Sequence, residues 1–158
     1  MKLRTLSVLV DDRAGVLMQV SSLFARRGFN IHSLTVGNSE RQGLSRMTIV
    51  VDVTTKSLEQ ATKQLNKLIH VIKVTELDAE NSVERELALF KIRAEPAHRW
   101  QILELARMFQ ASVVDVAETS ATVEFSGSTL ELETLARMLE PLGVVELARS
   151  GCVALARG

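Results

Sequence analysis

Hydrophobic and polar positions alternate along this chain with two periods, which follow each other in a regular order. Positions 3–10 alternate with period two, as in a strand, and positions 14–27 form one apolar helical stripe that stops at Gly28. Two alternating segments, a second helical segment and a closing strand complete the order βαββαβ; we predict them at 31–37, 44–53, 57–69 and 71–77.

The same order returns in the second half of the chain. The pattern predicts strands and helices at 86–94, 97–109, 112–117, 121–125, 128–140 and 144–149. Pro96 is predicted at the first helical position of one helix, and Pro141 and Gly143 are predicted to end the other. Ser57 and Ser128 each begin a capping-box pattern. The polar stretch 78–84 separates the repeats, so we predict two domains, 1–78 and 79–158.

A βαββαβ unit is the ferredoxin-like arrangement, in which two helices cover one face of a four-stranded antiparallel sheet. The sequence therefore predicts an α+β protein with two consecutive ferredoxin-like domains. The face without helices would carry Thr5, Ser7 and Leu9 on the first strand. This face is too apolar to be wholly solvated, so we expect it to pack against another module or another chain.

Charge disfavours two classes of partner. Nineteen basic and nineteen acidic residues give a net charge of zero, whereas proteins that bind nucleic acid or anionic membranes usually carry a basic excess. Residues 1–79 hold 11 basic and 7 acidic residues, a net of +4, and residues 80–158 hold 8 and 12, a net of −4. A neutral total does little to keep copies apart and is compatible with oligomerisation.

The sequence contains no recognisable targeting signal and only one cysteine. The start of the chain lacks the pattern of a signal peptide, and the apolar stretches are far shorter than a membrane helix needs, so we predict a cytoplasmic protein. The single cysteine, Cys152, excludes an internal disulfide framework and is predicted to be a small buried hydrophobe.

The search for catalytic motifs predicts neither a catalytic site nor a metal site. GxGxxG, Walker A, HExxH, GxSxG and paired CxxC patterns are absent, and no two of the three histidines have helical metal-ligand spacing. Asp11 and Asp12 are predicted to be helix caps rather than an acid–base pair. Trp100 and Met108 are predicted to be core or interface residues rather than a cofactor platform.

One constellation is compatible with ligand binding. The turn at 12–15 leads directly into a helix, whose first N–H groups favour an anion, and Gly15 lets a ligand approach the backbone. Asn30 lies at the other end of that helix, so a site joining Asp12, Gly15 and Asn30 requires a second copy of the domain. Such a site would hold a carboxylate on N–H groups and an ammonium on Asp12 and the Asn30 carbonyl. Each residue also has a purely structural interpretation. Asp12 would be a helix cap, Gly15 a tolerated glycine in the first helical turn, and Asn30 a turn residue after the helix.

Three segments resemble a known family. LSVLVDDRAGVLMQVSSLFARRGFNIHSLTVG, LSRMTIVV and the C-terminal ARSGCVALARG are similar to the regulatory small subunit of acetolactate synthase, also called acetohydroxyacid synthase, and to its ACT domain. The resemblance implies an N-terminal ACT domain that binds an effector and a C-terminal ACT-like domain. It places the effector site at Asp12, Gly15 and Asn30, with Val16 and Ile31 as neighbours. In relatives an amide often stands where this chain has Asp12.

The resemblance also implies a function. The chain would not be a catalyst but would activate a large catalytic subunit. The half-apolar uncovered sheet face and the zero net charge separately predict a homodimer, in which the N-terminal ACT units pair through first strands and helices. It would confer feedback inhibition by valine on branched-chain amino-acid biosynthesis. Thiamine diphosphate, Mg²⁺ and FAD would lie on the catalytic subunit only. The alternatives are a free-standing ACT-type amino-acid sensor of another enzyme and a small enzyme on a ferredoxin-like scaffold.

Overall fold

The computed structural model describes all 158 residues, and their contacts divide the chain into two compact units. Unit 1 comprises Met1–Val83 together with Cys152–Gly158, and unit 2 comprises Glu84–Gly151. The C-terminal residues therefore belong to the N-terminal unit. This differs from the predicted division into 1–78 and 79–158 at both ends of the second domain.

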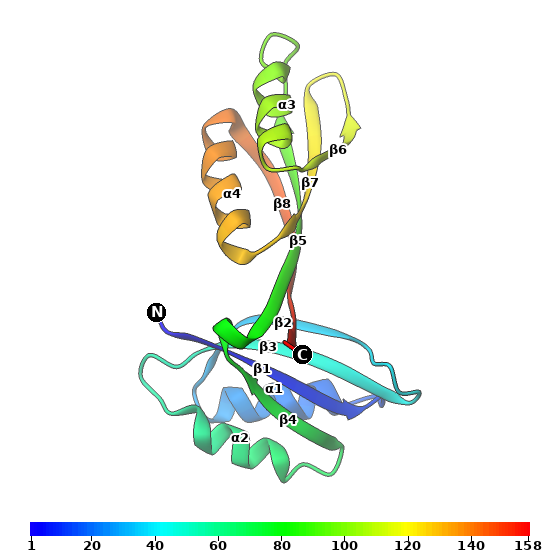
Figure 1. Cartoon of the computed structure of the whole chain (residues 1–158), viewed down its shortest axis with the longest axis vertical. Coiled ribbons are helices and arrows are strands. Elements are labelled where there is room, and N and C mark those ends of the chain that lie inside the picture. The colour runs from blue at the N-terminus through cyan, green and yellow to red at the C-terminus, as the bar shows by residue number, and fades with distance from the viewer. The chain divides into compact units, whose positions relative to one another are not determined.

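Unit 1 has the predicted βαββαβ order, and its two helices lie on the same side of the sheet (Figure 1). The sheet order is β2-β3-β1-β4, and all three neighbouring pairs of strands are antiparallel. Leu6, Val8 and Val10 of β1 are buried against the helices, as the period of two requires. The elements are β1 (Leu3–Asp11), α1 (Val16–Arg26), β2 (Asn30–Asn38), β3 (Leu44–Asp52), α2 (Leu58–Asn66), β4 (Val71–Leu77) and the 3₁₀ turn η1 (Ala79–Asn81).

Unit 2 repeats this architecture with sheet order β6-β7-β5-β8, which confirms the predicted pair of ferredoxin-like folds. Its core contains Phe90, Ile102 and Leu135 from a strand and both helices. The first residues of β5 and the last residues of β8 belong to unit 1. The elements are β5 (Ser82–Arg93), α3 (Arg99–Met108), β6 (Ser112–Val116), β7 (Ser120–Gly127), α4 (Thr129–Gly143) and β8 (Val144–Ala156).

The helix-free face of the unit 1 sheet is partly covered by the chain's own C-terminus. Thr5 stands between Val50 and Leu77 in the sheet register, and these two apolar side chains cluster with Cys152 and Ala154. The Cys152 N–H donates to the Ser33 hydroxyl at 2.9 Å. The residues that cover Val50 and Leu77 are therefore the end of β8, which belongs to unit 1 itself. Packing of this face against another module or another chain stays a prediction.

The predicted closing strand 144–149 is therefore seven residues too short at its C-terminal end. Beyond Gly151, which has φ of 85°, Cys152 and Ala154 are buried while Val153 and Leu155 are exposed. This alternation is that of a strand with one covered face, whereas residues 145–150 before the glycine are all exposed. Glycine adopts a positive φ readily, so Gly151 is a turn point within β8 rather than its end.

Three predicted helix ends need correction. Helix α3 begins at Arg99 after His98, so Pro96 lies in the preceding turn, which the His98 N–H closes by donating to the Glu95 carbonyl. Helix α4 continues through Pro141, because a proline in the last turn removes few helical hydrogen bonds. Ser128 forms the complete capping box, whereas Ser57 accepts only the Glu59 N–H.

The exposed surface of α3 contradicts one prediction about the core. Trp100 is 62% exposed and Met108 is 68% exposed, so neither belongs to the core of unit 2. Ile102 and Ala106 form the buried side of this helix instead. An interface role for Trp100 and Met108 stays a prediction.

Candidate functional site

The turn of residues 12–15 connects the end of β1 to the start of α1. Gly15 is the N-cap residue with φ of 89°, and no side chain caps the helix. Asp12 is therefore not a helix cap, contrary to the prediction. Apart from Gly15 itself and its two neighbours in the chain, no residue comes within 4 Å of the position that a Cβ on Gly15 would take. The start of α1 is thus open beside Gly15 and has no side-chain cap, which suits an anionic ligand.

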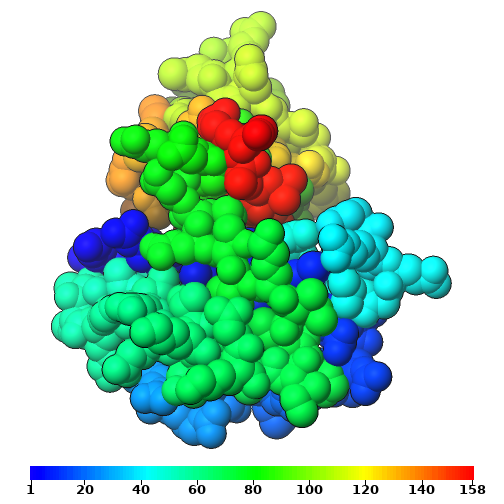
Figure 2. Space-filling model, turned by 60° about the horizontal axis from the view of Figure 1, so that its bottom comes forward, coloured from blue at the N-terminus to red at the C-terminus, as the bar shows by residue number.

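Two neighbouring segments hold this turn in place. The Asp11 N–H donates to the His70 carbonyl at 2.8 Å, and the Asp11 carboxylate lies 3.0 Å from His70 Nδ1. On the other side, the Asp12 N–H donates to the Gly43 carbonyl at 2.9 Å. Gly43 belongs to the β2–β3 turn, the cyan projection of unit 1 in Figure 2. Asp11 is a partner of His70 and not the helix cap that the sequence predicted.

Asn30 and Ile31 lie at the opposite end of the sheet from this turn. Asn30 is paired with Asp52 and thereby with Leu3, while Asp11 is paired with Leu44, eight positions further along β1. At the strand rise per residue, this places them about 25 Å apart. One copy of the chain therefore does not bring Asn30 to Asp12, in agreement with the expectation that a complete site needs two copies.

The remaining predicted site residues differ in what they can offer a ligand. The Val16 side chain is buried in the core of unit 1, and its backbone N–H donates to the Arg13 carbonyl at 3.4 Å. Ile31 is half-buried against the same core. It therefore lies on the face of the sheet that α1 covers, where its side chain can line an apolar part of a site.

The sheet topology excludes one predicted mode of dimerisation. Strand β1 is paired with β3 on one side and β4 on the other, so first strands of two copies cannot pair with each other. The edges available for pairing are β2 and β4. Helix α1 contacts β2, whereas α2 contacts β4, so the choice of edge also decides which helices meet.

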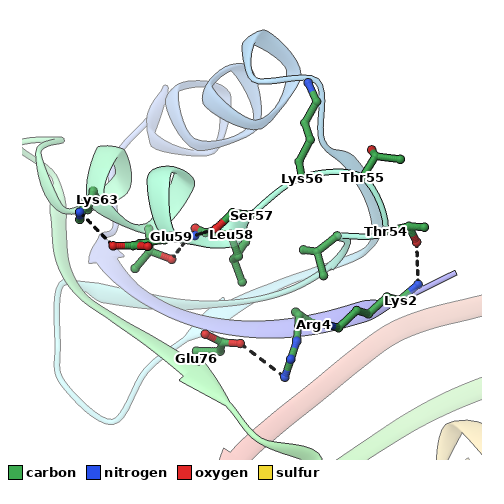
Figure 3. A pocket seen from close by; sticks show the side chains of 12 residues that line it. Lys2, Arg4, Thr54, Thr55, Lys56, Ser57, Leu58, Glu59, Lys63 and Glu76 are labelled. Atoms are coloured by element: carbon green, nitrogen blue, oxygen red, sulfur yellow. Dashed lines mark hydrogen bonds and ion pairs between the residues drawn. The ribbon is translucent and has the colours of Figure 1, made fainter.

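A separate cavity of about 790 Å³ opens beside the start of α2 (Figure 3). Three of its cationic side chains have partners: Arg4 lies 3.8 Å from Glu76, Lys63 lies 3.0 Å from Glu59, and Lys56 donates to the Arg27 carbonyl at the end of α1. None of the predicted effector residues lines it. Its lining residues are Lys2, Arg4, Val53, Thr54, Thr55, Lys56, Ser57, Leu58, Glu59, Thr62, Lys63 and Glu76.

Other chemistry is limited in this structure. No group of three or more His, Cys, Asp or Glu side chains is arranged to hold a metal ion. Cys152 is 3% exposed and forms no disulfide, which confirms its prediction as a buried small hydrophobe. None of the helices combines the length and apolarity needed to cross a membrane. The cytoplasmic location stays a prediction.

Comparison with known families identifies both halves of the chain. Residues 6–73 match the model of the AHAS small subunit-like ACT domain, and residues 85–158 match the model named small subunit of acetolactate synthase. The chain belongs to the acetolactate synthase small-subunit family. The resemblance seen in the sequence is thereby confirmed over almost its whole length.

Individual members of the acetolactate synthase small-subunit family match the full chain. The small subunit of Mycolicibacterium smegmatis is 58% identical over 154 residues, covering 98% of this chain and 91% of the relative. A probable small subunit of Archaeoglobus fulgidus is 50% identical, covering 98% and 96%. The crystal structure of the Thermotoga maritima small subunit has a TM-score of 0.92 at 42% identity, covering 100% and 99% of the two chains.

Membership defines the role of the chain at a coarse level. It is a non-catalytic regulatory subunit with an ACT domain, and the catalytic large subunit of acetolactate synthase is its implied partner. Its pathway is the biosynthesis of branched-chain amino acids. A small enzyme on the same scaffold, one of the alternatives from the sequence, is incompatible with this membership.

Proposed function

We propose that this chain activates the catalytic subunit of acetolactate synthase and makes it sensitive to feedback inhibition by valine. The joint enzyme would condense two pyruvates to acetolactate, or pyruvate with 2-oxobutyrate. The observation that carries the proposal is the uncapped start of α1 at Gly15, above a turn anchored to His70 and Gly43 in an ACT domain. An amino acid that is an end product of this pathway is a suitable ligand for such a site.

The zwitterion of valine fits the groups at this site. Its carboxylate would accept hydrogen bonds from N–H groups in the first turn of α1, where the helix dipole also favours negative charge. Its ammonium would lie between the Asp12 carboxylate and the Asn30 carbonyl of a second copy, both of which are acceptors. Ile31 of that copy would contact the isopropyl group.

We further propose a homodimer in which two unit 1 sheets pair antiparallel through their β2 edges. A two-fold axis across β2 places the Asn30 end of one strand beside the Asn38 end of the other. The Asn38 end is also where the Asp12 turn lies, because the Asp12 N–H is bonded to Gly43. Since α1 contacts β2, the same pairing brings the two α1 helices together. Each dimer then has two equivalent effector sites.

The cofactors of the reaction belong to the partner in this proposal. Thiamine diphosphate, Mg²⁺ and FAD are assigned to the catalytic subunit, and this chain contributes regulation alone. We also propose a cytoplasmic location, where pyruvate and the catalytic subunit would be available to the regulatory chain.

Reconstitution with the large subunit tests the function. Acetolactate formation is measured for the large subunit alone, for this chain alone and for the mixture, each with and without valine. We expect no turnover by this chain, a higher rate for the mixture and a valine-dependent loss of that rate. An unchanged rate in the mixture would contradict activation, and valine binding without any effect on the rate would favour a sensor of another enzyme.

A further inference from the structure

His70 makes two contacts with one residue next to the proposed effector site. Its carbonyl accepts the Asp11 N–H at 2.8 Å, and its Nδ1 lies 3.0 Å from the Asp11 carboxylate oxygen Oδ2. Both side chains are shielded, with exposed fractions of 26% for His70 and 30% for Asp11. Asp11 directly precedes Asp12, so its position sets where the turn of residues 12–15 begins.

A register shift in the sheet creates this pairing. Leu9 of β1 stands opposite Lys73 of β4, and a regular antiparallel ladder would then place Val10 opposite Ile72 and Asp11 opposite Val71. The register shifts between Leu9 and Val10, so Val10 is opposite Val71 instead. The next residue, His70, therefore comes beside Asp11. Bulges of this kind re-aim side chains and are common next to functional sites.

The contact has consequences for the start of α1. Because no side chain caps this helix, a mobile carboxylate nearby competes with a ligand carboxylate for its N–H groups. Asp11 is a candidate competitor, and His70 engages its carboxylate on the β4 side. The two Asp11 contacts, together with the bond from Asp12 to Gly43, order the turn before a ligand arrives. Ordering a loop in advance lowers the entropy cost of binding.

We propose that His70 is a positioning residue for the effector site, acting through Asp11 to hold the turn of residues 12–15 in its binding geometry. The inference rests on the proposed function, since the ligand at this turn is the amino-acid effector. His70 does not itself contact the ligand in this arrangement. Its role is to orient Asp11 and to keep that carboxylate off the helix start.

The test uses the full chain with three variants. His70→Ala removes the side-chain contact, His70→Asn retains a donor that can reach Asp11, and His98→Ala is a matched control at an exposed histidine of unit 2. Valine affinity is measured by calorimetry, and the melting temperature is recorded for each variant. We expect His70→Ala to weaken valine binding roughly tenfold, the size of one hydrogen bond to a charged group. His70→Asn should recover most of the affinity, and His98→Ala should match the wild type.

A second measurement makes the outcome independent of the effector's identity. In ligand-free protein, amide hydrogen exchange at Gly15 and Asp12 should be faster in His70→Ala than in the wild type. Unchanged exchange and unchanged valine affinity in His70→Ala would overturn the positioning role. An equal loss in His70→Ala and His70→Asn that follows the melting temperature would also overturn it, because it indicates stability alone. If the wild type does not bind valine but exchange is still faster in His70→Ala, the proposed effector is contradicted and the positioning of the turn is supported.

Discussion

Arg149 and Glu86 form a two-point ion pair in unit 2, with Nε 2.8 Å from Oε1 and Nη2 2.9 Å from Oε2. Glu86 is 6% exposed, and its hydrogen bonds raise the pKa of Arg149. The pair joins β5 to β8, so it ties together the two strands that continue into unit 1. A buried carboxylate of this kind depends on its partner, because it has lost its water.

Arg149→Ala should destabilise the chain by leaving the Glu86 carboxylate without its cation. We expect a loss of about 2–3 kcal/mol in the free energy of unfolding, less than for a fully buried pair because Arg149 keeps contact with solvent. Lys91→Ala is the control, since its pair with Glu146 is exposed and should contribute less than about 0.5 kcal/mol. Urea titration measures both. Equal effects of the two changes would contradict the importance of burial.

Lowering the pH should reduce the stability that Asp52, the last residue of β3, contributes to unit 1. The hydroxyl and the N–H of Thr54 donate to its carboxylate and hold the pKa of Asp52 below its ordinary value of 3.8. A depressed pKa means that the folded state prefers the charged form. Its contribution is therefore present above about pH 4 and is lost as the pH falls through the folded pKa. The melting temperature of Thr54→Val should fall below that of wild type at pH 6, and the difference should shrink as the pH falls below about 4. Thr55→Val, at an exposed neighbour, should show no such convergence.

Valine resistance should follow from changes at either half of the effector site. Gly15→Asp places a carboxylate at the helix start, where the ligand carboxylate would bind. Asn30→Ala removes the side-chain amide that would face the ligand ammonium from the second copy. Loss of one hydrogen bond to a charged group should raise the half-inhibition concentration roughly tenfold to a hundredfold. Activation should persist, because a ligand shifts an equilibrium only by its differential affinity. Asn66→Ala on α2 is the control. An unchanged half-inhibition concentration in both variants would place the site elsewhere.

Dimerisation should depend on one edge of the unit 1 sheet and not on the other. Val36 on β2 and Ile72 on β4 are similarly exposed, at 44% and 49%. Val36→Asp introduces like charges near the proposed two-fold axis and should weaken the dimer at least about tenfold. Ile72→Asp should leave it unchanged. Sedimentation velocity over a concentration series measures both dissociation constants, and the opposite ranking would assign the interface to β4.

The C-terminal residues should stabilise unit 1 although they follow unit 2 in sequence. Ala154→Asp would bury a carboxylate against Val50 and Leu77, which should cost about 2–4 kcal/mol. Val153→Asp changes the exposed neighbour on the same strand and should cost less than about 0.5 kcal/mol. Thermal unfolding compares the two. Similar stability of both variants would show that the C-terminal residues do not pack on this sheet in solution.

Local patterns in the sequence determined the elements, their order and the fold of each half. The period of two buries Leu6, Val8 and Val10 on one face, and Ser128 with Glu131 begins α4, because burial and capping are settled within a few residues. Gly28 ends α1 with φ of 71° for the same local reason. Asp12, Gly15 and Asn30 could be singled out in this way, together with the requirement for a second copy.

Only the tertiary structure decided which distant residues meet. His70 lies 59 positions from Asp11, and their contact depends on a one-residue register shift that no local pattern encodes. Cys152 meets Ser33 across 119 positions, which assigns the end of the chain to unit 1 rather than to the unit it follows. The central place of β1, and hence the exclusion of first-strand pairing, also follows from strand order. The hydrophobic period indicates which face of an element is buried, and capping residues indicate where a helix begins or ends. Strand pairing and register depend instead on the packing of the whole sheet.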